Sequence, residues 1–329
     1  MVHSFDVNNI FSLSGSAESF TDQALQVFQF QYGQNRIYRQ WCGLIGVQPP
    51  AVKTLSSVPA LPISFFKTEA VGTTDFIPEI VFESSGTTQS QPSRHLVKEL
   101  AVYKKSFLEG FRHFYGNIED WCILGLLPSY LERQHSSLVL MVDEMIRLSK
   151  HPDSGFYLDE HQKLSDCLQK LEAGGQKTLL IGVTFGLLDF AAAYPQQLAH
   201  TVVMETGGMK GRRKELTREE VHQLLRQRLG VEKIHSEYGM TELLSQAYSK
   251  GDGRFYCPPW MKVLVRDEED PLLTRESGTG ILQVADLANV YSAAFIATED
   301  VGRVYEDGSF EVWGRMDNSD IRGCSLLVL

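Results

Sequence analysis

The stretch from residue 79 to residue 95, EIVFESSGTTQSQPSRH, constrains the fold of this chain more than any other segment. Residues 79–82 form a short, largely apolar run that is typical of a buried strand, and a turn rich in hydroxyl groups follows it. From about Pro92 onward, apolar residues recur every three or four positions, which indicates one face of an amphipathic helix. The segment therefore predicts a strand, a small polar loop and the start of a helix.

This predicted loop has the chemistry of an anion site. The first N–H groups of a helix are unpaired and the helix dipole favours negative charge, so a phosphate would be stabilised there. The hydroxyl groups add donors, and a glycine lets the backbone approach a ligand closely. The residues concerned are Ser84, Ser85, Gly86, Thr87 and Thr88. An ordinary connection is the alternative, because these residue types are common in loops and the sequence has no Walker motif.

Composition and charge exclude several classes of protein. With 43% hydrophobic and 22% charged residues, the 329-residue chain is an ordinary globular sequence with ample length for a large core. Its formal charge of -10 argues against a nucleic-acid-binding surface, and the basic run at residues 210–214 is too short to change that. The start of the chain does not read as a signal peptide. The most apolar long segment, residues 179–194, contains Asp189 and falls short of a membrane span, so we expect a cytoplasmic protein.

The order of expected elements predicts an α/β fold. Apolar runs at residues 121–127, 178–183 and 202–204 are typical of buried strands, and segments with helical periodicity separate them. One of these helices begins with a capping box at Thr217 and ends at Gly230. Further along, several short strands follow one another, two of them joined by the hairpin turn Asp307-Gly308. We therefore predict a mostly parallel sheet flanked by helices, with a β-rich section near the C-terminus.

Four short motifs carry a resemblance to a known superfamily. They are SSGTT at residues 84–88, YGMTE at 238–242, TEDVGR at 298–303 and GRMD at 314–317. Each is weak evidence alone, but together and in this order they resemble the adenylate-forming enzymes: acyl-CoA synthetases, luciferases and peptide-synthetase adenylation domains. Longer phrases such as SEYGMTELLSQAY and GRMDNSDIRGCSLLVL look like LuxE-type acyl-protein synthetases. The resemblance implies the fold of the N-terminal domain of these enzymes and the ATP-dependent activation of a carboxylic acid, with a fatty acid as the expected substrate.

The resemblance also implies a set of site residues. The hydroxyl-rich loop, Ser84 to Thr88, would hold the β- and γ-phosphates of ATP, and Thr241 would reach the α-phosphate. Glu242 would bind Mg²⁺, a cation that prefers oxygen ligands. Tyr238 and Gly239 would form the adenine side of the site, with Tyr238 stacked on the base. The remaining implied ATP contacts are Gly207 and Gly208 in the adenine slot, Asp300 on the ribose hydroxyls, and Arg315 near the ribose or phosphate.

The sequence departs from the superfamily pattern in the phosphate loop. Gln89 stands where a second glycine is usual, and Arg94 and His95 stand near the place of the usual lysine. These changes would loosen phosphate binding or transfer the positive charge to Arg94. His95 and His235 lie beside motifs and are candidates for contact with a phosphate or the acid, although a packed or surface histidine is the alternative for both.

The end of the sequence suits the LuxE-type interpretation. Larger relatives continue into a domain that supplies a lysine and binds coenzyme A, whereas this sequence ends at Leu329, so we expect that large domain to be absent. We predict an adenylate-forming domain at residues 1–314 and a short tail at 315–329 that carries Cys324. The resemblance implies that Cys324 accepts the acyl group and passes it to a partner reductase or acyl carrier. Arg322 would favour the thiolate, and the alternative is an inert, buried cysteine.

Two other functions remain open at this point. One is an acyl- or aryl-CoA ligase core that works with a separately encoded C-terminal domain. The other is a nucleotide-binding scaffold with weak catalysis, which the unusual Gln89 keeps open. The five cysteines are widely spaced and include no C-x-x-C pair, so zinc and dithiol sites have no support. Apart from Cys324, we expect them to be core or loop residues: Cys42, Cys122, Cys167 and Cys257.

Overall fold

A computed structural model describes residues 5–13, 16–84, 91–128, 134–207, 216–267, 269–270 and 272–316. The helices are α1 Ala17–Gln34, α2 Arg36–Leu44, α3 Phe65–Thr68, α4 Leu100–Tyr115, α5 Ser137–Ser149, α6 His161–Ala173, α7 Thr184–Ala193 and α8 Arg218–Leu229. The first strands are β1 Leu61–Pro62, β2 Ile80–Glu83, β3 Arg94–Val97, β4 Cys122–Leu126, β5 Gly155–Phe156, β6 Thr178–Gly182, β7 Thr201–Glu205 and β8 Ile234–Tyr238. The later strands are β9 Ala247–Ser249, β10 Phe255–Tyr256, β11 Met261–Arg266, β12 Thr274–Arg275, β13 Gly278–Asp286, β14 Phe295–Val304 and β15 Phe310–Arg315.

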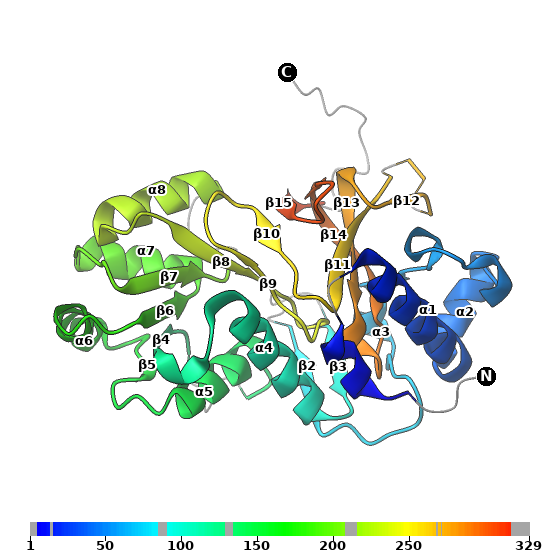
Figure 1. Cartoon of the computed structure of the whole chain (residues 1–329), viewed down its shortest axis with the longest axis horizontal. Helices are drawn as coiled ribbons and strands as arrows, with labels where there is room; N and C mark the ends of the chain where they lie inside the picture. The colour runs from blue at the N-terminus through cyan, green and yellow to red at the C-terminus, as the bar shows by residue number, and fades with distance from the viewer. Residues whose placement is uncertain are drawn as a thin grey trace.

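The first half of the large sheet is the parallel part predicted from the sequence. Its strands lie in the order β5, β4, β6, β7, β8, and each neighbouring pair is parallel. Alternate residues of β4 and β6 enter two different cores, because successive side chains of a strand point to opposite faces. Helices α6, α7 and α8 pack on one core, whereas α4 and α5 contribute to the other (Figure 1). This two-sided cover explains why every residue of both strands is buried and nearly all of them are apolar.

The second half of the sheet is antiparallel and contains the predicted β-rich section. From β8 the order continues through β9, β10, β15, β14, β13, β11 and β12, and β1 joins β14 in parallel. The Asp307-Gly308 hairpin is confirmed: Tyr305 N donates to Ser309 O at 2.8 Å, and Gly308 has the positive φ of +79° that such a turn requires. Where the sequence analysis expected several short strands, the segment before this turn forms one longer strand, β14, from Phe295 to Val304.

The segment after the hydroxyl-rich loop differs from the prediction. Residues 94–97 form β3, which pairs antiparallel with β2, and the helix α4 begins only at Leu100. The loop therefore connects two strands of a hairpin, and a strand, not a helix, follows it in the chain. The prediction of a helix start directly after the loop, and the argument from its dipole, were therefore wrong. The apolar pattern of residues 94–97 is too short to distinguish a strand from a helix, and the structure shows a strand. At the start of the loop, Glu83 N donates to His135 O at 2.9 Å and Ser84 N donates to Ser93 O at 3.1 Å.

Helix ends follow the sequence signals more closely. The capping box of α8 is present, with Glu220 N donating to Thr217 Oγ1 and Thr217 N donating to Glu220 Oε2. Gly230 ends the helix in the left-handed conformation, as expected of a C-terminal glycine. These contacts are local in sequence, which is why they were predictable.

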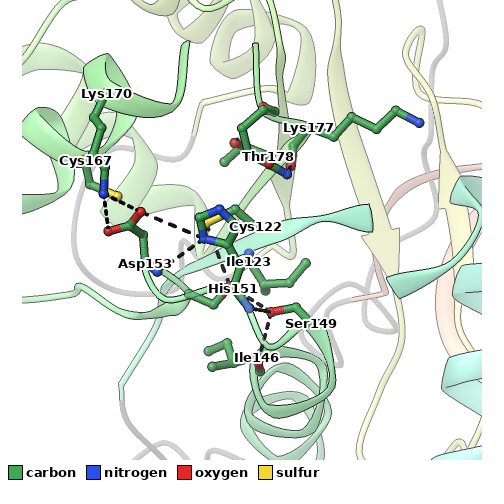
Figure 2. A network of polar contacts seen from close by, with 12 residues as sticks. Cys122, Ile123, Ile146, Ser149, His151, Asp153, Cys167, Lys170, Lys177 and Thr178 are labelled. Carbon is green, nitrogen blue, oxygen red and sulfur yellow. Dashed lines mark hydrogen bonds and ion pairs between the residues drawn. The ribbon is translucent and has the colours of Figure 1, made fainter. Parts of the chain in front are cut away.

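A polar network at the amino end of β4 connects this strand to α5, α6 and the segment before β5 (Figure 2). Ile123 N donates to Ser154 Oγ at 2.9 Å, and the same hydroxyl is 2.8 Å from Ser149 Oγ at the end of α5. Lys170 of α6 is paired with Asp153 at 2.8 Å. Cys122 and Cys167 lie within this network, and burial raises the pKa of both thiols. Cys42 is also buried and Cys257 is half-buried, which confirms the expected core or loop positions.

Candidate active site

A cavity of about 490 Å³ lies where the ends of β2, β7 and β8 meet the start of α5. This volume is within the range of small-molecule sites, roughly 300–1,000 Å³. Residues from two of the sequence motifs line it together with the implied adenine-slot residue Gly207: Ser84, Gly239 and Thr241. The parallel strands β7 and β8 contribute their carboxyl ends, the place where ligands bind in open α/β sheets.

Gly207 is held in the cavity wall by Glu205, the last residue of β7. The carboxylate of Glu205 accepts from Gly207 N at 2.8 Å and from Thr184 Oγ1 at 3.1 Å, and Thr184 N donates to Gly207 O. Gly207 adopts a φ of +75°, which favours glycine. Glu205 therefore fixes the turn that the sequence assigned to the adenine slot, a role that no motif revealed.

The charge of Glu205 is stabilised although the residue is buried. Burial raises the pKa of a carboxyl group, but hydrogen bonds from His222 and Ser236, the charge of Arg218 and the Gly207 N–H outweigh it, so the pKa of Glu205 is lowered to about 2. Arg218 lies 3.5 Å from the carboxylate. Glu205 thus remains negatively charged beside the cavity.

The loop that carries Thr241 is fastened from the opposite side by β3 and the segment after β13. His95 Nδ1 lies 2.8 Å from Thr241 O, and His95 Nε2 lies 3.0 Å from Asn289 Oδ1. Asn289 Nδ2 in turn donates to Glu242 O at 2.7 Å. Burial lowers the pKa of His95 to about 4, against the effect of these hydrogen bonds. His95 thus packs beneath the loop backbone and does not line the main cavity.

Glu242 is a buried carboxyl group with few protein partners. Its side chain is 5% exposed, and it receives a hydrogen bond from Ser93. Burial raises the pKa of Glu242, while this hydrogen bond and the charge of Arg315 oppose the shift. Ser93 N also donates to Ser84 Oγ at 2.9 Å, so Ser93 joins the start of the phosphate loop to Glu242. The sequence analysis did not identify Ser93, because its role depends on a hairpin that was not predicted.

Asp300 links two predicted site residues from different strands. Tyr238 donates its hydroxyl to Asp300 Oδ2 at 2.8 Å, and Arg315 Nε donates to Asp300 Oδ1 at 2.9 Å. Asp300 is 4% exposed, and it pairs with Arg315 in the register of β14 and β15. The ring of Tyr238 makes edge contacts with Phe255 and Phe310, which are stacked on each other, and Tyr238 is 8% exposed. These three residues form one connected polar unit on the face of β8 opposite to Glu237.

A second buried carboxylate supports the segment that follows Glu242. Asp286 is fully buried and accepts from Leu244 N at 2.8 Å and from Ser245 N at 2.9 Å. It also accepts from Ser245 Oγ and Ala288 N. The turn after the YGMTE motif is therefore tied to the end of β13, which makes the position of Glu242 dependent on contacts far apart in the sequence.

Several predicted residues fall outside the part of the chain that the structure describes. They are Ser85, Gly86, Thr87, Thr88, Gly208 and Cys324. Their assignments, like those of Arg322 and Gln89, stay predictions. Arg94 is described and lies 3.9 Å from Glu83 on an exposed part of the hairpin. His235 contacts Tyr115, whose hydroxyl is 3.1 Å from Nδ1, and does not line the main cavity.

Glu237 and Gln246 also line the cavity, and the sequence analysis did not identify either of them. Both side chains lie over Gly239: a Cβ atom at this glycine would be 2.3 Å from Glu237 Oε1 and 3.5 Å from Gln246 Cγ. Burial, and then the charge of Glu205, raises the pKa of Glu237 to about 8. A larger residue at this position would therefore displace the carboxyl group of Glu237, and Glu237 is largely protonated at neutral pH.

The raised pKa of Glu237 predicts a pH dependence of stability. The Glu237 carboxyl group loses its proton near pH 4.3 in the unfolded chain but only near pH 8 in the folded protein. Its contribution to the free energy of unfolding is therefore complete below pH 4.3 and decreases as the pH rises from there to about 8. We expect the wild type to lose roughly 2 kcal/mol of unfolding free energy relative to Glu237→Gln between pH 6 and pH 8. Urea unfolding of both proteins at the two pH values measures this difference. An equal change in both proteins would contradict it.

Two absences hold for the described part of the chain. No group of three or more His, Cys, Asp or Glu side chains there is arranged to bind a metal ion. Within the same residues, none of the helices has the length and apolar character needed to cross a membrane.

Comparison with known proteins identifies a relative by sequence. No family model matches the chain. The sequence is 22% identical over 328 residues to the long-chain-fatty-acid–luciferin-component ligase of Vibrio harveyi, covering 91% of this chain and 84% of that enzyme. The predicted resemblance to LuxE-type ligases is thereby confirmed.

Solved structures show the fold. A 2-hydroxyisobutyryl-CoA ligase, solved with its acyl-adenylate and CoA, matches with a TM-score of 0.67 and 14% identity, covering 92% of this chain and 68% of that chain. ATP-bound MatB from Rhodopseudomonas palustris matches with a TM-score of 0.54 and 16% identity, covering 71% of this chain. This chain is matched to about half of MatB, 47% of its length. The predicted α/β fold of the adenylate-forming enzymes is confirmed.

Proposed function

We propose that this chain activates a carboxylic acid with ATP. An oxygen of the carboxylate attacks the α-phosphorus, the bond from that phosphorus to the bridging oxygen breaks, and acyl-adenylate and pyrophosphate are formed. The observation that carries the proposal is the convergence of three distant segments on one cavity: Ser84, Gly207 and the run from Gly239 to Thr241. The sequence similarity to a long-chain-fatty-acid ligase supports a fatty acid as the substrate class.

We assign the phosphate side of the site to the β2–β3 hairpin and the YGMTE loop. Ser84 begins the loop whose further residues, Ser85 to Thr88, would hold the β- and γ-phosphates. Thr241 lines the cavity beside it and would donate to the α-phosphate. Glu242 would bind Mg²⁺, which would neutralise charge on the phosphate oxygens. Donors and a metal placed around the phosphates before the reaction would stabilise the charge that builds up in the transition state.

We assign the adenosine side to the residues around Gly207 and Asp300. Gly207 and Gly208 would line the adenine slot together with Tyr238 and Gly239. Asp300 would accept hydrogen bonds from the ribose hydroxyls, and Arg315 would hold the carboxylate from the other side. Because Tyr238 is largely buried and donates to Asp300, we also assign it the task of orienting that carboxylate.

The acyl acceptor is proposed to be Cys324. Its thiolate would attack the carbonyl carbon of the acyl-adenylate, the bond to the AMP oxygen would break, and a thioester and AMP would result. The supporting fact within the described residues is that Cys42, Cys122 and Cys167 are buried, and that burial raises the pKa of all three thiols. The acyl group would then pass to a partner reductase or acyl carrier.

Replacing Cys324 with serine is expected to leave adenylate formation unchanged and to abolish the covalently bound acyl group. A labelled acid, ATP and Mg²⁺ would be mixed with each protein, and label released by hydroxylamine would be counted. Cys257→Ser provides the matched control and should retain the label. Label retained by Cys324→Ser at another cysteine would contradict the assignment.

The proposed activity is tested by ATP–pyrophosphate exchange with Mg²⁺ and a panel of acids from acetate through tetradecanoate to aryl acids. Exchange that depends on one class of acid is expected. Nucleotide binding without exchange by any acid would favour the scaffold instead. Exchange followed by transfer to coenzyme A, only when a separate C-terminal domain is added, would favour the CoA-ligase core.

A further inference from the structure

Two polar side chains at the cavity wall have no hydrogen-bond partner among the described residues. Gln246 is 6% exposed, and its Oε1 atom is buried without a partner. Glu237 is only partly buried, and no hydrogen bond involves its carboxyl group. Both residues line the same cavity as Thr241, and both lie against Gly239.

An unpaired buried acceptor is unfavourable, and native proteins pair the great majority of them. Gln246 does not contribute a hydrogen bond that holds the fold together, unlike Gln31, whose amide donates to three carbonyl groups. A cavity-facing acceptor that the protein leaves unpaired is available to a ligand instead. Since Gln246 lies in the cavity shared with Thr241, this ligand would be the substrate whose carboxylate is activated there.

We propose that the acid bound in this cavity carries a hydrogen-bond donor on its chain, a hydroxyl or an amino group, which is bound by Gln246 and Glu237. This inference rests on the proposed function and refines its substrate class. Gln246 Oε1 would accept from the donor. A hydroxyl would use its one proton for Gln246 and accept from protonated Glu237, whereas an amino group has enough N–H bonds to donate to both residues. The substrate would thus be a functionalised fatty or aryl acid, and a plain hydrocarbon chain would leave both groups unpaired.

The opposite interpretation is that the two side chains only close the cavity against a plain acyl chain. In that case Glu237 would be a protonated side chain that only occupies space in the cavity wall, and Gln246 would have a structural role. The two interpretations differ in their expected substrates, because a site built to bond a polar group rejects the analogue that lacks it. They also differ in the effect of removing the glutamine, because only a structural glutamine supports the fold without ligand.

The test compares matched acids with the wild type and with Gln246→Met. The sets are hexanoate with 6-hydroxy- and 6-aminohexanoate, tetradecanoate with 3-hydroxytetradecanoate, and benzoate with 4-hydroxy- and 4-aminobenzoate. The kcat/KM of pyrophosphate exchange gives one measurement, and calorimetric binding of each acid without ATP gives another. Gln283→Met is the matched control, because Gln283 is buried in β13 and does not line the cavity.

We expect the donor-bearing member of at least one set to be preferred by about tenfold or more in the wild type. Gln246→Met should lose that preference, whereas Gln283→Met should keep it. Equal or weaker use of every donor-bearing acid would overturn the inference and leave the adenylation proposal intact. If no acid supports exchange, the binding preference still decides the inference, and equal binding or no binding of every acid overturns it.

The stability of the free protein provides an independent readout. Because Gln246 Oε1 has no partner, Gln246→Met should leave the melting temperature unchanged or raise it. A fall of several degrees in the absence of any acid would show that the glutamine is structural and would overturn the inference.

Discussion

Replacing Glu242 with glutamine is expected to lower the rate of pyrophosphate exchange by about a hundredfold or more. Glutamine keeps the shape of the side chain but removes the negative charge, so it is a poor ligand for Mg²⁺. Glu242 suits the metal because it is 5% exposed and is bonded to Ser93, which also bonds the start of the phosphate loop. A metal ion bound by Glu242 would therefore be close to the proposed phosphate loop, which begins at Ser84.

The fold should tolerate this change. Burial raises the pKa of Glu242, so its charged form is costly in the free protein and a neutral amide removes that cost. The pH profile follows from the same fact: metal binding requires the ionised carboxyl, so exchange by the wild type should weaken as pH falls, and higher Mg²⁺ should offset the loss.

The measurement is exchange as a function of Mg²⁺ concentration at several pH values, with thermal unfolding as a check of the fold. Glu232→Gln is the control, because Glu232 is an exposed carboxylate on the connection before β8 and should leave exchange unchanged. If Glu242→Gln exchanged pyrophosphate at the wild-type rate at the same Mg²⁺ concentration, the assignment of Glu242 as the Mg²⁺ ligand would be wrong.

Replacing Asp300 with asparagine is expected to raise the KM for ATP by roughly ten- to a hundredfold, with a smaller effect on the KM for the acid. The buried carboxylate accepts from Tyr238 on one oxygen and from Arg315 on the other. The amide nitrogen of asparagine is a donor, so the hydrogen bond to either Tyr238 or Arg315 is lost. The ribose hydroxyls also lose a negatively charged acceptor.

The effect on ATP should exceed the effect on stability. The side chain of Arg315 is 50% exposed, so water can hydrate its guanidinium group when Asp300 is neutralised. Separate measurement of KM for ATP and for the acid distinguishes a nucleotide contact from general loss of structure. Asp307→Asn is the control in the adjoining hairpin, where Asp307 bonds Ser309 and Arg254. An unchanged KM for ATP in Asp300→Asn would contradict the ribose assignment.

Local signals in the sequence predicted much of the fold. The strands β4 and β6 were recognisable because both faces are covered and every position is therefore buried. The limits of α8 followed from Thr217, Glu220 and Gly230, which act within one turn of the helix ends. The turn at Asp307-Gly308 was predictable for the same reason.

The site could be predicted only in part. The motifs led to Ser84, Gly207, Gly239 and Thr241, and the structure places all four on one cavity. The residues that hold them in position were missed, namely Glu205, Ser93, Asn289 and Asp286. Their roles arise from contacts between segments far apart in the chain, and a hydrogen bond of that kind leaves no periodicity or spacing in the sequence.

The sequence by itself determined the alternation of strands and helices and the local signals at their ends, because these depend on residues close together in the chain. In the strand β8, Glu237 and Tyr238 point to opposite faces, because side chains alternate along a strand. Only the tertiary structure decided that Tyr238 faces Asp300 and that Glu237 faces the cavity. It likewise decided that residues 94–97 pair with β2, because a four-residue pattern fits a strand or a helix until a neighbouring strand supplies its hydrogen bonds.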